Sequence, residues 1–294
     1  MYELVQVAEH TYYVESPAKV GVVEVAPGEV VLIDSGGDRS AAKKVRAHFD
    51  AHGWCLRAIY LTHSHADHTG GCRYLQSVTG CAVYAPGAEQ AFTAWTWLEP
   101  TYLYGGYPPA ELRHKFLVAQ SFEVQPLTPE ALPEGWETID LPGHFFHMVG
   151  YRTPDDVVFI ADCLSSEATL AKYRVSFLYD VTAYLQTLER VAQMQARIFV
   201  PAHAAVTEDI APLARINIEA THQVADDLAA LCEQPIGFDD LLAQVFTRYD
   251  LRMTYEQHAL VGSTVRSYLS YLAGEGRIKP VIQDNRWLWV QAAR

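Results

Sequence analysis

Apolar and polar positions form blocks along this 294-residue chain, and successive blocks predict strands and helices in turn. Residues 2–34 alternate with a period of two around Pro27-Gly28, which predicts strands and a hairpin. Residues 40–52 predict a helix that Ser40 caps and Gly53 stops. Short apolar runs then alternate with helical segments, which is the rhythm of an α/β fold. The further predicted strands cover residues 56–61, 82–84, 121–125, 136–140, 148–152, 157–161 and 197–201, and the further predicted helices cover 70–79 and 181–195.

Two aromatic stretches interrupt this rhythm. The first, residues 86–119, carries Trp95, Trp97, Tyr102, Tyr104, Tyr107 and Phe116. The second, residues 172–179, carries the candidates for substrate binding, which are Lys172, Tyr173, Arg174 and Tyr179. Aromatic loops of this kind favour an apolar pocket or lid, and a helix-packing or dimer surface explains them equally well. Lys172 and Arg174 could hold an anionic group of a substrate, although a solvated loop is the simpler interpretation.

The pattern changes after His203. A long helix is predicted at residues 211–232, and shorter helices are predicted at 237–246, 255–258 and 260–275. Two strands are predicted within residues 274–290 about an Asp284-Asn285 turn. Helices followed by a β-ribbon resemble a winged helix. We therefore expect a winged-helix-like α+β domain at residues 216–294 after a first domain at residues 1–215. Trp287 and Trp289 share one side of a strand and are expected to cover apolar surface of the first domain, or of a second subunit in a homodimer.

Composition narrows the class of protein. A 50% share of hydrophobic residues can bury a large core, and no apolar run is long enough to cross a membrane. The N-terminal residues lack the features of a signal peptide, and five cysteines without paired spacing indicate reduced thiols, so we expect a cytoplasmic protein. The net charge of −13 and the absence of a Lys/Arg run argue against nucleic acid as the partner and favour a small-molecule substrate.

The stretch His63-Ser-His65-Ala-Asp67-His68 carries the main chemical signal. It places three histidines and a carboxylate within six residues, just after the apolar run 56–61. Imidazole and carboxylate groups are the side chains that bind zinc-like divalent ions. Because side chains alternate at the end of a strand, one ion is not expected to take all four, whereas two adjacent ions can share them. Three further candidates each follow a predicted strand, and they are His144, Asp162 and His203.

In this order, the residues resemble the motifs of the metallo-β-lactamase superfamily over about residues 1–215. The family's first Asp falls at Asp34, its His-x-His-x-Asp-His run at His63 to His68, its Pro-Gly-His motif at His144, its Ala-Asp motif at Asp162 and its Pro-x-His motif at His203. The resemblance implies an α/β fold, a four-layer αββα sandwich, followed by the winged-helix-like domain. It also implies two divalent metal ions, with Zn²⁺ expected and Fe or Mn as alternatives. The implied roles are His63, His65 and His144 for one ion, Asp67, His68 and His203 for the other, Asp162 as a bridge, and Asp34 as the residue that orients a ligand histidine.

The activity that the resemblance implies is hydrolysis. A hydroxide held between the two ions would attack the substrate, and Asp67 would relay a proton, so no serine or cysteine nucleophile is required. The leading hypothesis is a dinuclear zinc hydrolase of esters, thioesters or lactones. The alternatives are a mononuclear iron sulfur dioxygenase, an RNA or DNA phosphodiesterase, and a non-enzymatic module.

Two residues near the motifs need a separate interpretation. The family often has a second histidine four residues after the ligand, where this chain has Met148, and His147 stands one residue earlier. His147 is therefore an alternative ligand to His144 or a hydrogen-bonding neighbour of the site. Cys163 follows Asp162 directly, and we interpret it as a small buried residue rather than a catalytic thiol.

Overall fold

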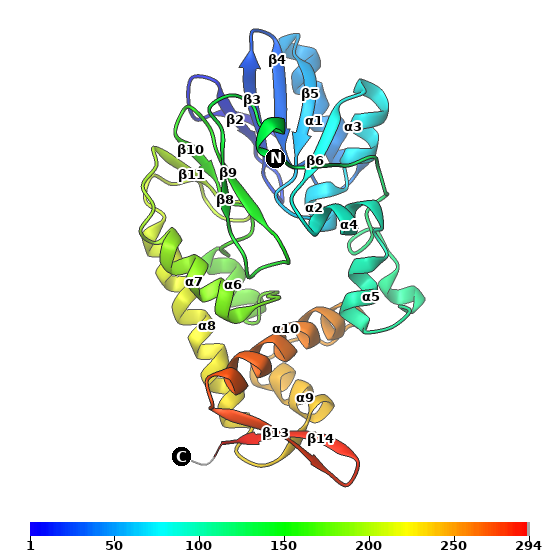
Figure 1. Cartoon of the computed structure of the whole chain (residues 1–294), viewed down its shortest axis with the longest axis vertical. Coiled ribbons are helices and arrows are strands. Elements are labelled where there is room, and N and C mark those ends of the chain that lie inside the picture. The colour runs from blue at the N-terminus through cyan, green and yellow to red at the C-terminus, as the bar shows by residue number, and fades with distance from the viewer. Residues whose placement is uncertain (293–294) are drawn as a thin grey trace.

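Two β-sheets pack face to face with helices on their outer sides, and a helical unit extends beyond them (Figure 1). The computed structural model describes residues 1–292. The first sheet has seven strands in chain order. They are β1 (Leu4–Gln6), β2 (Thr11–Val14), β3 (Val20–Ala26), β4 (Glu29–Ile33), β5 (Cys55–Tyr60), β6 (Ala82–Ala85) and β7 (Gln125–Pro126). Strands β1 to β4 pair antiparallel, whereas β4 to β7 pair parallel.

The second sheet completes a four-layer arrangement. Its order is β11-β10-β9-β8, with bounds β8 (Glu137–Asp140), β9 (Val149–Arg152), β10 (Val157–Phe159) and β11 (Ile198–Val200). Tyr151 and Phe159 of this sheet meet Val31 and Tyr60 of the first sheet in a buried cluster between the two. Helices α1 (Arg39–His52) and α3 (Cys72–Thr79) cover the outer face of the first sheet, and α7 (Val181–Val191) and α8 (Ala211–Leu231) cover the second. The predicted αββα sandwich is therefore confirmed.

Helix ends and one strand differ from the prediction in detail. Asp38, rather than Ser40, caps α1, because its carboxylate accepts hydrogen bonds from the backbone N–H groups of residues 40 and 41. Gly53 ends this helix as predicted, in the left-handed conformation at φ 68°. The strand predicted at residues 121–125 is wrong over most of its length, since β7 pairs only at Gln125 and Pro126. Phe122 packs into the core there, so the apolar alternation reflects burial without strand pairing.

The C-terminal unit combines helices with a third sheet. It contains α9 (Phe238–Arg248), α10 (Tyr255–Gly274) and three strands in the order β12-β14-β13, with bounds β12 (Ile236–Gly237), β13 (Ile278–Gln283) and β14 (Arg286–Gln291). The two helices predicted at 255–258 and 260–275 form the single helix α10, because Ala259 between them is a buried helical residue. The Asp284-Asn285 turn is confirmed, with φ near 51° and 59° and Gln283 paired to Arg286.

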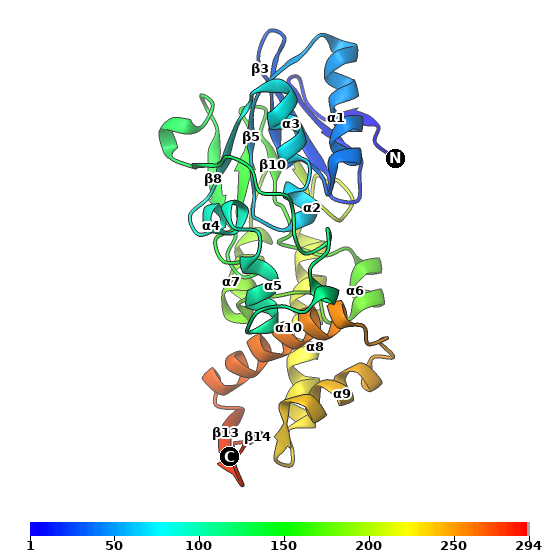
Figure 2. The same ribbon diagram turned by 90° about the vertical axis from the view of Figure 1, so that its right-hand side faces the viewer.

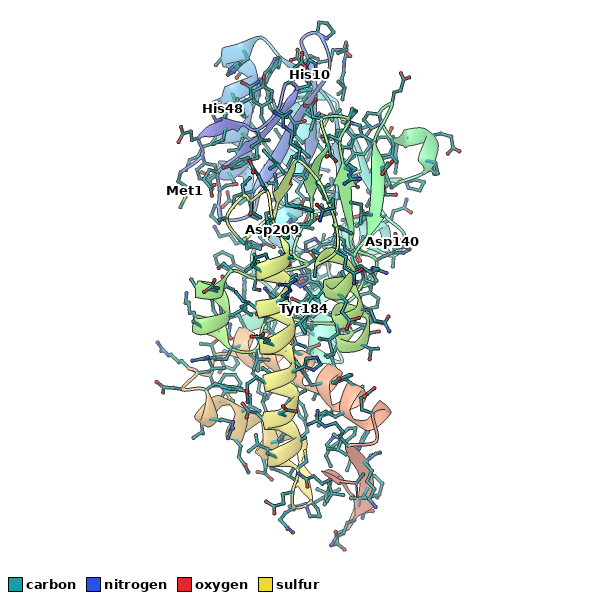
Figure 3. All side chains as sticks on the ribbon, turned by 90° about the vertical axis from the view of Figure 1, so that its left-hand side faces the viewer. Met1, His10, His48, Asp140, Tyr184 and Asp209 are labelled. Carbon is teal, nitrogen blue, oxygen red and sulfur yellow. The ribbon has the colours of Figure 1, made fainter. Side chains whose placement is uncertain are left out.

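Helix α8 connects the sandwich to this unit. In Figure 3 it runs from the region of Asp209 past Tyr184 towards the third sheet. The domain boundary predicted after residue 215 falls inside α8 and stays a prediction. Trp287 is 62% exposed on the ribbon at the end of the molecule away from the sandwich, so its predicted packing on the first domain is wrong. Its packing on a second subunit stays a prediction.

Helix α10 brings the C-terminal unit to the first aromatic stretch. That stretch contains α4 (Glu89–Ala94), α5 (Leu98–Tyr104) and the 3-10 turn η1 (Ala110–Leu112). Ala259 of α10 packs against Leu103, Leu112 and Leu117, and the Ser263 hydroxyl donates to the Tyr102 hydroxyl at 3.1 Å. Figure 2 shows α10 crossing next to α5. Among residues 1–292, no helix is both long enough and apolar enough to span a membrane.

Candidate metal centre

The predicted ligands lie on loops that follow strands at one end of the sandwich. Asp34 follows β4, and His63 and His65 follow β5 and lead into the short helix α2 (Ala66–Thr69), which carries Asp67 and His68. His144, Asp162 and His203 follow β8, β10 and β11. Two glycines permit the close approach of these loops. A side chain at Gly70 would meet the Gly37 carbonyl oxygen at 2.1 Å, and one at Gly143 would meet the α7 backbone at 2.3 Å.

The first group of ligand atoms consists of imidazole nitrogens alone. His63, His65 and His144 each offer a nitrogen, and these atoms lie within 4.8 Å of one another. The Nδ1 atom of His65 lies 3.0 Å from Nε2 of His63 and 3.1 Å from Nε2 of His144. Three nitrogens that converge from two loops form a set that one divalent ion can bind.

The second group mixes imidazole and carboxylate. Asp67, His68, Asp162 and His203 offer atoms that again lie within 4.8 Å of one another. The Nε2 atom of His203 is 3.3 Å from Oδ2 of Asp67 and 3.2 Å from Oδ2 of Asp162. The Oδ2 atom of Asp162 also lies 3.6 Å from Nε2 of His144 in the first group. Asp162 therefore stands between the two groups, where a bridging carboxylate has to be.

Three of the predicted ligand histidines make a hydrogen bond through the ring nitrogen that points away from the cluster, and this bond sets which nitrogen faces the site. The Nδ1 atom of His68 donates to Oδ2 of Asp34 at 2.8 Å, and Nδ1 of His203 donates to the Pro17 carbonyl at 2.7 Å. The Thr62 hydroxyl donates to Asp34 and so accepts from Nδ1 of His63 at 3.0 Å. In the neutral rings of these histidines, Nε2 then keeps its lone pair for the site.

Burial keeps the first group neutral. It lowers the pKa of His63 well below the usual range, lowers that of His65 to about 3, and lowers that of His144 as well. A neutral imidazole is the form that binds a cation.

Carboxylates hold protons on the second group. Asp162 raises the pKa of His203 to about 10. Burial alone would lower the pKa of His68, but the charge of Asp162, followed by Asp67 and Asp34, holds it well above the usual range. A metal ion that enters the second group therefore has to displace protons.

Two buried polar atoms test whether the cluster fits a metal ion. Nε2 of His68 and Oδ1 of Asp162 are buried and lie 3.1 Å apart as an ion pair, but neither has a partner with hydrogen-bond geometry. Buried polar atoms are almost always partnered, because an unpaired one loses its hydration without compensation. A divalent cation at this position would satisfy both atoms, and imidazole with carboxylate suits zinc, iron and manganese. The residues therefore fit a metal centre.

Two buried acids beside the cluster were not predicted. Glu89 accepts hydrogen bonds from the backbone and hydroxyl of Ser64 at 3.0 and 2.6 Å, and from the His147 backbone at 2.8 Å. It thereby joins the loop of His63 to the loop of His144. Glu99 of α5 lies 3.9 Å from Nε2 of His65, and burial raises its pKa well above the usual range. Neither acid belongs to a motif with characteristic spacing in the aromatic stretch, so the local sequence carried no signal for it.

The remaining candidates lie around the cluster. His147 belongs to neither group, and its ring packs against Gly87. Tyr179 lies beside the His144 loop, since its backbone N–H donates to the carbonyls of residues 143 and 144 and its ring stacks on Phe146 at 4.0 Å. The other three substrate candidates lie at the end of α6 (Glu167–Tyr173), and within residues 1–292 they form no hydrogen bond or ion pair with the cluster. These three are Lys172, Tyr173 and Arg174.

Aromatic rings lie beside the cluster. Phe145 and Phe177 lie 4.4 and 5.3 Å from the His65 ring, and Phe145 lies 6.3 Å from the Tyr102 ring. Tyr102 and Tyr179 line a cavity of about 930 Å³ between α5, α10 and the start of α7. The Cys163 thiol is fully buried, and burial raises its pKa, which makes it unreactive as a nucleophile.

Comparisons with known proteins agree with this geometry. The family model described as the metallo-beta-lactamase superfamily matches residues 14–203. An atrochrysone carboxyl ACP thioesterase from Aspergillus fumigatus is 26% identical over 184 residues, which is 62% of this chain and 49% of that protein. A hydroxyacylglutathione hydrolase from Methylobacillus flagellatus is 43% identical over 63 residues, 21% of this chain and 24% of that protein. The chain therefore spans half or less of the length of these relatives.

One solved structure extends the likeness to the whole chain. A metallo-beta-lactamase family protein from Thermus thermophilus has a TM-score of 0.72 at 19% identity, and the match covers 98% of each chain. The arrangement of the C-terminal unit after the sandwich is thus shared with a known fold.

Proposed function

Because the chain belongs to the metallo-β-lactamase superfamily, we propose that it is a metal-dependent hydrolase of thioesters that uses two zinc ions. The observation that carries the proposal is the convergence of seven predicted ligand side chains on two groups that meet at Asp162. The choice of thioesters among the predicted substrates is supported by relatives named as an ACP thioesterase and a hydroxyacylglutathione hydrolase, since both names describe the cleavage of thioesters.

Seven ligand side chains exceed what one tetrahedral ion uses, which supports two ions. In the proposed site His63, His65 and His144 would hold one ion and Asp67, His68 and His203 would hold the other, with Asp162 placed between the two groups. When bound, such ions lower the pKa of a water molecule to about 7 and polarise the carbonyl oxygen of a substrate.

The other side chains of the site orient groups and handle protons. Asp34 keeps the His68 ring in position through its 2.8 Å hydrogen bond. Asp67 has a half-exposed side chain, so its carboxylate can take a proton at the site and pass it to solvent. Phe145 and Phe177 keep water from the His65 side, which strengthens every electrostatic interaction within the site.

Metal analysis and a thiol-release assay test the proposal together. Protein purified without added metal should contain about two zinc ions per chain. It should release free thiol from a glutathione thioester or an acyl-carrier-protein thioester. Asp162→Asn should lose both metal and activity. Asp284→Asn, at an exposed position of the distant ribbon, is the matched control and should keep both.

Two other results would replace the proposal. About one iron per chain, with oxygen uptake on a persulfide substrate, would favour the dioxygenase. Cleavage of RNA or DNA by the metal-loaded protein, without thiol release from any thioester, would favour the phosphodiesterase.

A further inference from the structure

Basic side chains are unevenly distributed over this acidic protein. Helices α1 and α3 carry five basic residues and one acidic residue, whereas the rest of the chain carries 17 basic and 34 acidic residues. The five basic residues are Arg39, Lys43, Lys44, Arg46 and Arg73, and we call them the α1–α3 basic patch. Both helices belong to the outer layer over the first sheet, as Figure 2 shows. A positive layer thus lies on a protein of net charge −13.

The patch is organised around Tyr74 on α3. The Arg39 guanidinium and the Lys43 ammonium lie 5.4 and 6.0 Å from the centre of the Tyr74 ring. Arg46 donates to the Tyr74 hydroxyl at 3.4 Å. Within residues 1–292, Arg46 is the one member of the patch with an ion pair to an acid, and that acid is Asp50 at 3.8 Å. The other four cations are exposed. Lys44 lies over the Tyr2 ring at 4.1 Å, whereas Arg39, Lys43 and Arg73 are left to meet the negative charges of a partner.

A groove leads from the patch to the candidate metal centre. Its outer part has a volume of about 470 Å³ and is lined by Arg39, Arg73 and Tyr74. Its inner part has a volume of about 200 Å³ and reaches Asp67, one of the predicted metal ligands. The two parts adjoin, because Gly37, Asp38 and Lys115 line both. The surface between the patch and Asp67 is therefore hollowed on both sides of the Asp38–Lys115 ion pair.

The acidic groups along the groove leave the patch positive. Asp38 is bound by the N-terminus of α1, where its carboxylate accepts two backbone hydrogen bonds, and by Lys115 at 3.2 Å. Asp67 faces His203 at the inner end. The cations Arg39 and Arg73 have no such acidic partner within the described residues, so the outer part of the groove carries net positive charge.

We propose that the α1–α3 basic patch is the docking surface for an acidic carrier protein, which delivers a thioester to the metal centre through the groove. The proposal rests on the thioesterase function. An acidic protein surface complements the patch, and a long flexible arm that carries a thioester can reach from the patch along the groove towards Asp67. Five cations are fewer than the roughly six to ten phosphate contacts typical of nucleic-acid binding, and the acidic remainder of the chain would repel a longer polyanion.

Charge reversal tests the docking surface. The triple variant Arg39→Glu, Lys43→Glu, Arg73→Glu reverses three of the four exposed cations of the patch. A control triple variant, Arg215→Glu, Arg252→Glu, Lys279→Glu, makes the same charge change at exposed positions elsewhere. Two substrates carry the same octanoyl thioester, one on an acyl carrier protein and the other on N-acetylcysteamine. The measured quantity is the ratio of kcat/KM for the carrier-bound thioester to kcat/KM for the free one.

The ratio should fall by about tenfold or more in the patch variant and stay near the wild-type value in the control. In the wild type it should also fall as salt rises from about 0.02 to 0.3 M, because salt screens exposed charges. Fluorescence anisotropy of labelled carrier protein gives a readout without turnover, and its Kd should weaken by a similar factor in the patch variant.

Three outcomes would overturn the inference. Equal ratios and equal Kd values in the two triple variants would show that the carrier binds elsewhere or not at all. Tighter binding of single-stranded RNA than of carrier protein, lost in the patch variant, would assign the patch to RNA. Hydrolysis of the free thioester without any preference for the carrier would refute the docking surface alone. Hydrolysis of neither thioester, in contrast, would refute the proposed function, and the anisotropy measurement would still decide the docking surface.

Discussion

Replacing Asp34 by alanine should weaken both metal binding and the fold around the site. The Asp34 carboxylate is buried and accepts three hydrogen bonds of 2.8 Å, from the backbone N–H of Thr62, the hydroxyl of Thr62 and Nδ1 of His68. It is also the one direct link between the loop after β4 and the His68 ring within the described residues. Removing it leaves buried donors without an acceptor and frees a predicted ligand to rotate.

The expected magnitudes follow from these contacts. A buried donor left without a partner costs about 1–3 kcal/mol, so the loss of the acceptor for the three donors on Thr62 and His68 should lower the free energy of unfolding of the metal-free protein by about 3 kcal/mol or more. The loss of a group that orients a ligand histidine should weaken zinc binding by about 10–100-fold. That factor corresponds to about 1.4–2.8 kcal/mol.

Asp34→Asn separates the two effects. The residue adopts a positive φ of 63°, which asparagine tolerates, and the amide oxygen can still accept from the Thr62 backbone. The amide nitrogen cannot accept from His68, so the fold should recover part of its stability while zinc affinity stays low. Zinc affinity is measured by competition with a chromophoric chelator, and stability by denaturant unfolding in EDTA. Wild-type zinc affinity in Asp34→Ala, whatever its stability, would refute the role of Asp34 in holding the His68 ring.

Three further predictions follow from the same centre. Metal binding at pH about 7.5 should release protons, and metal affinity should tighten up to pH about 10, because the neighbouring carboxylate raises the pKa of His203 to about 10. Calorimetry in buffers of different ionisation enthalpy measures the proton release. A metal affinity that does not depend on pH would contradict this prediction. Gly143→Ala should destabilise the protein by several kcal/mol more than Gly276→Ala. Both glycines have a positive φ, but only an alanine at position 143 would place its Cβ 2.3 Å from the α7 backbone. Equal losses of unfolding free energy in denaturant would contradict the packing argument. His144→Ala should lose about one metal ion per chain by elemental analysis, whereas His147→Ala should keep about two, and the reverse result would make His147 the ligand.

The motif order from Asp34 to His203 predicted the sandwich, and the same motif residues meet at one end of it. Strand β5 and the helix stop at Gly53 were readable for a local reason, because a short apolar run and the left-handed conformation of glycine depend on near neighbours. The Asp284-Asn285 turn was readable for the same reason. Each of these signals is carried by a few adjacent residues, so no knowledge of distant contacts was needed.

Most of the features that were predicted wrongly depend instead on contacts between residues that are far apart in the chain. The strand predicted at 121–125 required a partner along its whole length, and β6 offers one only at its end. The helix α1 begins at Arg39, because the carboxylate of Asp38 before it accepts from two backbone N–H groups, which a count of apolar positions does not reveal. Trp287 lies far from the first domain because the ribbon is placed by α8 and α10, and their directions are tertiary facts.

By itself, the sequence determined the types of metal-binding side chain and their order, since these depend on residue chemistry alone. The sandwich that carries them was implied by the family resemblance of that motif order. Only the tertiary structure decided that Glu89 joins two ligand loops, that Glu99 lies 3.9 Å from His65, and that a groove connects Asp67 with a basic patch. The physical reason is that these groups are far apart in the chain and carry no periodic signal. They meet because α5 is packed against α10 and because α1 and α3 share one face of the first sheet, and packing of that kind is settled by the whole fold at once.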